Sequence, residues 1–140
     1  MLSKKTNSKP LSEAKVGVKE YRRMIKRGKK NGGDANGLTR SILTYLSFRN
    51  WYGVRINTQG QWDDKLKIWK KSHTRKGTAD IHACIHGLHV SIEIKTGNDR
   101  MRSDQHETKK LVEKAGGYYV VVSCFEDFIV FLKQINISDF

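Results

Sequence analysis

The sequence has little that would suit a membrane or an oxidising compartment. It contains only two cysteines, Cys84 and Cys124, and lacks the CxxC spacing of a metal site. No apolar run approaches the roughly 18 residues of a membrane span, and the N-terminus has no signal-peptide apolar region. Repeats and low-complexity segments are also absent from the sequence. We therefore expect a reduced, intracellular protein, and 140 residues leave room for one domain with one core.

Acidic residues are scarce, because 14 Asp and Glu stand against 27 Lys and Arg, a formal net charge of +13. Such a balance indicates a polyanionic partner, nucleic acid first and an acidic membrane surface second. Residues 1–33 hold eleven Lys or Arg and two Glu, which is +9 of that charge. We expect a basic N-terminal extension over 1–33 and a domain over 34–140. Residues 11–30 fit either a docking helix or a solvated arm, and 31–33 would end the helix.

Residues 77–95, GTADIHACIHGLHVSIEIK, alternate polar and apolar residues around His86-Gly87. This pattern predicts two half-buried antiparallel strands joined by a two-residue loop. Such a loop fixes which residues face each other. On the core side, the facing pairs are Ile81 with Ile92, Ala83 with Val90 and Ile85 with Leu88, with Ile94 on the same face. On the polar side, they are Asp80 with Glu93, His82 with Ser91 and Cys84 with His89, with Lys95 beyond them.

Asp80 and Glu93 would then be like charges with Cβ atoms about 4.5–5.5 Å apart, an arrangement that is destabilising by itself. A divalent cation between them, with Lys95 nearby, is the simplest compensation. Hard oxygen ligands of this kind suit Mg²⁺ or Mn²⁺. The sequence therefore predicts a site for one of these ions at the end of the two strands.

The histidines offer a less favoured alternative. His82, Cys84 and His89 share the polar face, and N and S ligands suit Zn²⁺, but a fourth ligand is not evident. His82 can instead contact a substrate. We expect His73 and His106 to be plain surface residues.

A helix is predicted over 36–50, with Leu38, Ile42, Tyr45 and Leu46 at helical spacing and Asp34 or Asn36 as its cap. A strand is predicted over 51–58. Residues 61–76 mix tryptophans with lysines and arginines, which suits backbone and stacking contacts with nucleic acid; the alternative is an edge strand whose lysines block aggregation. The expected nucleic-acid-binding residues are Arg55, Lys65, Lys67, Lys70, Lys71, Arg75 and Lys76.

The C-terminal third predicts a helix, a strand and a helix. Ser103 would cap the first helix and Gly116-Gly117 would end it. Its buried face would carry Leu111, Val112 and Ala115. Residues 118–123 are almost continuously apolar, which is typical of an interior strand covered on both faces. Residues 125–135 fit a final helix with Phe128, Ile129, Phe131 and Leu132, so the expected fold class is α/β.

Asp80, followed by Glu93-Ile94-Lys95, matches the D…ExK signature of the PD-(D/E)XK nuclease superfamily. The segments KGTADI, IEIKTG and EKAGGYYVVVS, with Gln105 between them, extend the match. Over residues 36–130 the chain resembles the VRR-NUC family, including its small phage-type members. The resemblance implies a restriction-endonuclease-like core (αβββαβα), a mixed β-sheet flanked by helices. It also implies metal-dependent hydrolysis of DNA that leaves a 5′-phosphate and a 3′-hydroxyl.

The resemblance also implies the roles of five residues. Asp80 and Glu93 would hold Mg²⁺ or Mn²⁺, and the backbone carbonyl of Ile94 would be a further ligand. Lys95 would orient the attacking water or stabilise the developing charge. Gln105 would hold Lys95 or a phosphate.

The sequence departs from the family at one position. Family members often have a Glu on the helix before the first strand, whereas here only Asn36 or Asp34 lies near that place. Asn36 could coordinate through its amide oxygen, and a weaker site or a lost second metal stays open. Small members often act as dimers or larger assemblies on branched DNA, so we expect a junction or flap substrate and the cytoplasm of a bacterial or phage-infected cell. An inactive DNA-binding protein and a nuclease acting on RNA are the alternatives.

Overall fold

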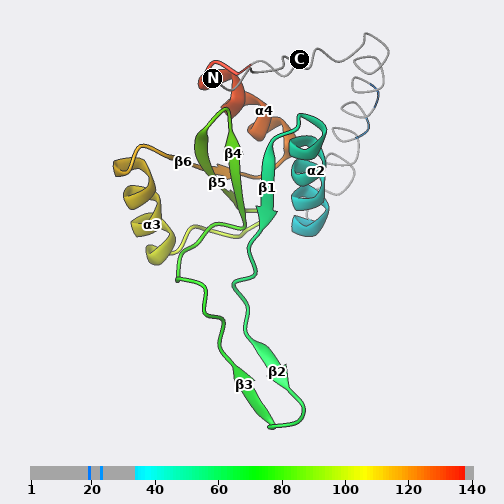
Figure 1. The fold of residues 1–140 in the computed structure, drawn as a ribbon, viewed down its shortest axis with the longest axis vertical. Helices are drawn as coiled ribbons and strands as arrows, with labels where there is room; N and C mark the ends of the chain where they lie inside the picture. Colours follow the sequence, from blue (N-terminus) through cyan, green and yellow to red (C-terminus); the bar gives the residue numbers. More distant parts are fainter. Residues whose placement is uncertain (1–18, 20–22, 24–33, 138–140) are drawn as a thin grey trace, which may run out of the picture.

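The computed structural model describes Lys19, Arg23 and residues 34–137. Its elements in chain order are α2 (Ala35–Phe48), β1 (Tyr52–Arg55), β2 (Gln61–Asp63), β3 (Ile68–Lys70), β4 (Ile81–Ile85), β5 (Leu88–Ile94), α3 (Ser103–Lys114), β6 (Tyr118–Val122) and α4 (Phe125–Gln134). Four strands form a mixed sheet in the order β1-β4-β5-β6, in which only β5 and β6 are parallel. Helices α2 and α4 cover one face and α3 lies at the other (Figure 1). The predicted α/β class is confirmed.

The hydrophobic core lies between the sheet and helices α2 and α4. Every apolar residue predicted for the inner faces of these two helices is buried: Leu38, Ile42, Tyr45, Leu46, Phe128, Ile129, Phe131 and Leu132. The ring of Tyr45 meets Phe125 and Phe128 edge-on, with ring centroids 5.6 and 5.9 Å apart, a favoured aromatic arrangement. Asp34 caps α2 by accepting the Asn36 N–H at 3.0 Å, as predicted.

Strands β4 and β5 pair in the predicted register. The five facing pairs from Ile81–Ile92 to Ile85–Leu88 are present, whereas Asp80, predicted to face Glu93, lies one residue before β4 and outside the ladder. His86 and Gly87 have φ values of 50° and 82°, which is the conformation that a two-residue hairpin loop of type I′ requires. The register follows from the loop, and it places Ser91 and Glu93 on the face toward α3.

Helix α3 differs from its prediction at its start. Ser103 is its first residue rather than its cap, and Arg102 is the cap. The Gln105 side-chain oxygen accepts the Arg102 N–H at 3.0 Å, so a residue inside the first turn satisfies the end of the helix. Capping from within the helix leaves no role for the Ser103 hydroxyl.

The expected buried face of α3 is also wrong. Leu111 is 48% exposed, Ala115 is exposed and Val112 is half-buried. The apolar spacing is helical, but the sheet face opposite carries polar side chains, so α3 does not pack down on it. Strand β6 is likewise an edge strand, not an interior one. Its apolar run is explained by α3 and α4, which both contact it.

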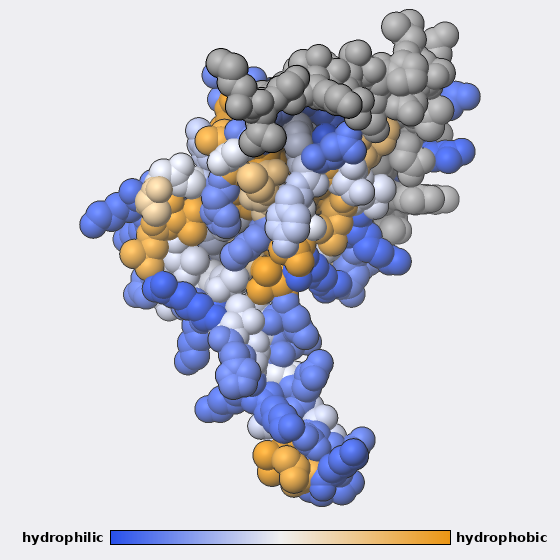
Figure 2. Space-filling model, in the orientation of Figure 1, coloured by the Kyte–Doolittle hydropathy of each residue, from blue (hydrophilic) through white to orange (hydrophobic). Residues whose placement is uncertain are grey.

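Strands β2 and β3 form a separate hairpin that projects from the sheet (Figure 1). Trp62 and Trp69 face each other across it and are 53% and 61% exposed. The Asp63 carboxylate accepts the backbone N–H groups of Lys65 and Leu66 at 2.9 and 3.0 Å, which shapes the turn. Figure 2 shows an apolar patch at the far end of this hairpin, surrounded by hydrophilic residues.

The predicted basic helix over 11–30 and its end at 31–33 lie outside the described residues, apart from Lys19 and Arg23, which are helical and exposed. In the part of the chain that the structure describes, no helix is long and apolar enough to cross a membrane.

Gly77 packs against the first turns of α3. Its replacement should therefore lower the free energy of unfolding. Gly77 is buried with φ +78°, and an added Cβ would overlap the backbone carbonyl of Asp104. Gly87 has φ +82° but nothing within 4 Å of an added Cβ. Gly87→Ala should therefore lose only the conformational term of about 1–2 kcal/mol. Gly77→Ala should lose roughly 1–3 kcal/mol more from the overlap. Urea unfolding measures both, and equal losses would contradict the close packing at Gly77.

Candidate active site

The Glu93 carboxylate is the centre of the candidate site. It extends from β5 and is only 3% exposed. Its Oε1 accepts a hydrogen bond from Gln105 Nε2 at 2.5 Å and lies 3.1 Å from Lys95 Nζ. Its Oε2 accepts a hydrogen bond from the Tyr119 hydroxyl at 3.5 Å. Groups from α3, from β6 and from the end of β5 thus meet on one carboxylate.

Asp80 lies just before β4 and is attached to β5. Its Oδ2 accepts the backbone N–H of Ile94 at 2.8 Å, and its backbone carbonyl accepts the N–H of Ile56 at 2.8 Å. Asp80 also lines a cavity of about 380 Å³ together with Arg55 and residues 56–59. Asp80 and Glu93 are close enough for the Asp80 charge to raise the pKa of Glu93.

Burial raises the pKa of Glu93 above its ordinary value, and the nearby Asp80 charge raises it further. Lys95 and Gln105 oppose this shift because they stabilise the ionised carboxylate. The pKa of Tyr119 is also raised, by burial and then by the charges of Glu93 and Asp80. Tyr119 is therefore a protonated hydrogen-bond donor at neutral pH, and the Asp80 charge makes ionisation of Glu93 less favourable.

Lys95 is held between two carboxylates. Its Nζ lies 3.1 Å from Glu93 and 3.3 Å from Asp99, and its side chain is only 10% exposed. Its backbone N–H donates to the Val122 carbonyl at 3.0 Å, which anchors this end of β5 to β6. The ammonium group is thus fixed beside the carboxylates.

Gln105 is the only buried residue of α3. The sequence suggested that it holds Lys95 or a phosphate, whereas the structure places its Nε2 on Glu93 and its Oε1 on the Arg102 N–H. Both ends of the amide are satisfied, so Gln105 fixes the direction of the Glu93 carboxylate.

Asn36, which the sequence suggested as a metal ligand, lies in the first turn of α2. Its Oδ1 accepts a hydrogen bond from Arg55 Nη2 at 2.7 Å. Because Arg55 and Asp80 line the same cavity, Asn36 is connected to the site through Arg55. Its amide oxygen already has a cationic partner.

The donor atoms fit Mg²⁺ or Mn²⁺ better than Zn²⁺. Among the described residues, no three His, Cys, Asp or Glu side chains form a group that could hold a metal ion, whether zinc or magnesium. Mg²⁺ keeps several waters and is commonly held by one or two carboxylates. Asp80 and Glu93 supply that number, and the Ile94 carbonyl remains a proposed addition. His73 and His106 are exposed, as predicted.

A basic groove of about 810 Å³ runs from the base of the β2–β3 hairpin to the start of α3. We use this name for the space whose charged and aromatic lining includes Trp69, Lys71, Arg75, Lys76 and Arg102. All seven predicted nucleic-acid-binding residues are exposed. Lys70 pairs with Asp63 at 2.5 Å and Lys67 with Asp64 at 3.7 Å. Within residues 34–137, no carboxylate pairs with the other lysines and arginines of the hairpin region.

Comparisons of the chain with protein-family models, curated proteins and solved structures gave no match. The resemblance to VRR-NUC nucleases therefore rests on the motifs of this sequence.

Sequence reasoning did not single out Tyr119 and Asp99. Tyr119 lies in an apolar run, and only the parallel pairing of β6 with β5 brings its hydroxyl to Glu93. Asp99 follows Lys95 by four residues in a loop. This spacing could have predicted the ion pair, because a loop that folds back on itself can bring a carboxylate close to a lysine.

The raised pKa of Glu93 predicts how stability depends on pH. In the unfolded chain the carboxyl ionises at its ordinary pKa near 4.5. The folded protein retains the proton to higher pH, so this contribution to stability is complete below 4.5 and is lost as pH rises through the folded pKa. Glu93→Gln keeps the shape and does not ionise. In metal-free buffer, the free energy of unfolding of the variant relative to wild type should increase from pH 4 to pH 8, by about 1.4 kcal/mol per unit of pKa shift.

Urea unfolding across this pH range measures the effect, and Glu107→Gln is the matched control at an exposed position of α3. An identical pH trend for the two variants relative to wild type would contradict the assigned environment of Glu93.

Proposed function

We propose that this protein is a metal-dependent DNA endonuclease of the VRR-NUC type, with Asp80, Glu93, Lys95 and Gln105 at its active centre. The carrying observation is the buried Glu93 carboxylate beside Asp80, contacted by Lys95 and Gln105. Structural ion pairs rarely place two carboxylates together in a buried place, because like charges there are destabilising. The order of α2, β1, β4, β5, α3, β6 and α4 supports a restriction-endonuclease-like core with the β2–β3 hairpin inserted.

Each residue has a distinct task in phosphodiester hydrolysis. Lys95 and Gln105 favour the ionised form of Glu93, which is the form that binds a cation. Gln105 is a positioning residue, since both ends of its amide are fixed. The Lys95 ammonium contacts Glu93 and Asp99. It is placed to orient a water or to stabilise negative charge on the phosphate. When bound, Mg²⁺ or Mn²⁺ supplies Lewis acidity and lowers the pKa of water.

The basic groove and the projecting hairpin support DNA as the substrate. The exposed lysines neutralise phosphates, and the exposed pair Trp62 and Trp69 offers aromatic faces. We propose branched DNA, a junction or a flap, as the substrate, cleaved by a dimer or larger assembly.

Removal of one carboxylate should abolish cleavage. Asp80→Asn can still accept the Ile94 N–H, so the fold should survive, whereas Mg²⁺-dependent cleavage should fall by about 100-fold or more, the scale of a lost catalytic group. Lys95→Ala should lose activity on a similar scale. The assay uses labelled duplex, junction, flap and RNA substrates with Mg²⁺ or Mn²⁺.

Asp64→Asn, an exposed change in the hairpin turn, is the matched control and should retain turnover at saturating DNA. Mg²⁺ should also raise the Tm of wild type more than that of Asp80→Asn, because binding only to the folded state stabilises it. Strong residual Mg²⁺-dependent cleavage in Asp80→Asn would overturn the proposal. If wild type binds DNA without cleaving it, the protein is better described as an inactive DNA-binding protein. If it cleaves RNA alone, it is better described as a nuclease acting on RNA.

Salt dependence tests the groove. Lys71 and Lys76 line it, and each should neutralise about one phosphate. Lys71→Gln and Lys76→Gln should each reduce the slope of log K against log salt by about 0.9 on duplex DNA. Lys133→Gln, on the last turn of α4, should leave the slope unchanged. Fluorescence anisotropy with a labelled duplex measures these slopes, and unchanged slopes in both groove variants would place the DNA elsewhere.

A further inference from the structure

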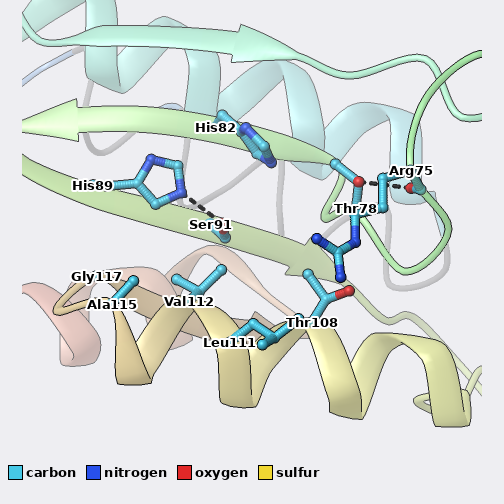
Figure 3. Close-up of a pocket in the computed structure, with 10 residues that line it drawn as sticks. All are labelled: Arg75, Thr78, His82, His89, Ser91, Thr108, Leu111, Val112, Ala115 and Gly117. Atoms are coloured by element: carbon cyan, nitrogen blue, oxygen red, sulfur yellow. Dashed lines mark hydrogen bonds between the residues drawn. The ribbon is translucent and has the colours of Figure 1, made fainter.

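A second cavity, of about 370 Å³, lies between α3 and the polar face of β4 and β5 (Figure 3). Its strand side is formed by His82, His89 and Ser91, and its helix side by Thr108, Leu111 and Val112. One wall is therefore polar and the other is mostly apolar. Cavities of about 300–1,000 Å³ with an apolar wall and a few converging polar groups are typical small-ligand sites.

The cavity is open because α3 stands away from the sheet at this level. Leu111 is 48% exposed, and Val112 points toward the strands (Figure 3). At the far end, a Cβ added to Gly117 would lie 3.0 Å from Val112 Cγ1 and 3.3 Å from His89 Cδ2. The absence of a side chain at Gly117 keeps this end from closing.

The polar wall presents hydrogen-bonding groups. The rings of His82 and His89 meet edge-on with centroids 5.2 Å apart, and His89 Nε2 lies 2.9 Å from Ser91 Oγ. Each imidazole ring has two nitrogens, and a serine hydroxyl can both donate and accept, so this wall can hydrogen-bond to the edge of a heterocycle.

The cavity adjoins both the catalytic carboxylates and the basic groove. Ser91 and Glu93 point to the same side of β5 and are two residues apart, about 7 Å along the strand. Arg75 lines both this cavity and the basic groove, and its guanidinium points into the end of the cavity beside Thr108 (Figure 3). No carboxylate of residues 34–137 pairs with Arg75. A phosphate in the groove would thus have a base-sized, half-apolar space next to it.

We propose that this cavity binds one unpaired DNA base beside the phosphodiester that is cleaved, so that the substrate is DNA with an extrahelical or single-stranded nucleotide. The inference rests on the proposed nuclease function, since the DNA must lie across the same site. Leu111 and Val112 contact the face of the base, His82 and His89 contact its edge, and Arg75 contacts the adjoining phosphate. A base inside a duplex is stacked and paired, and it must leave the helix to enter such a cavity.

The test separates base from backbone. Two labelled duplexes differ at one bulged position, which carries either a deoxynucleotide or an abasic deoxynucleotide of the same charge. Anisotropy is measured in EDTA, so that no cleavage occurs. Wild type should bind the duplex with the bulged base about tenfold more tightly, in line with the energy of one base stacked on a protein wall. Equal affinity for the two duplexes would overturn the proposal, whether or not the protein cleaves DNA with Mg²⁺.

Two variants assign the preference to this cavity. Val112→Trp should fill it and remove the preference for the base, while affinity for the abasic duplex stays unchanged. Val130→Trp, the same change at a 52% exposed position of α4, is the matched control and should keep the preference. Leu111→Ala, at an already exposed position, should reduce the preference without risk to the core. The proposal would be overturned if both cavity variants still preferred the duplex with the bulged base. It would also be overturned if sedimentation showed that Leu111→Ala separates an oligomer into single chains.

Discussion

A buried carboxylate next to a second carboxylate is unfavourable when it is ionised, unless hydrogen bonds and positive charges stabilise it. Glu93 is such a carboxylate. Each compensating group comes from a different element: Lys95 from the end of β5, Gln105 from α3 and Tyr119 from β6. The Gln105 contact also joins the first turn of α3 to the sheet. The geometry of the site and the packing of α3 are therefore one arrangement.

The part of the fold that could be predicted is the part set by local rules. The His86-Gly87 loop and the alternation around it leave one register for β4 and β5, and that register is observed. The edge position of β6 and its parallel partner depend on contacts distant in sequence, so an apolar run could not reveal them. For the same reason, the hydroxyl of Tyr119 at Glu93 had no sequence signal, whereas Asp80, Glu93 and Lys95 did.

The failed prediction for α3 has a physical cause. Leu111 has helical spacing from other apolar residues, but burial needs an apolar surface opposite, and this sheet face presents His82 and Ser91. The core on the other face succeeds because strand and helix are both apolar there. Likewise, Asn36 sits where a ligand was considered, yet Arg55 occupies its amide oxygen. The sequence shows which side chains could be metal ligands. Their hydrogen bonds in the folded chain decide whether their atoms are free to bind a metal.

The link between Gln105 and Glu93 also explains why the second cavity exists. Gln105 lies in the first turn of α3, and close packing of Gly77 on Asp104 fixes the helix at the same end. The sheet face opposite the later turns is polar, and its histidines and serine contact one another rather than the helix. The second and third turns of α3 stand off, and Leu111 and Val112 remain facing a space. The bond that orients the proposed catalytic carboxylate thus also leaves room, two residues along the strand, for part of a substrate.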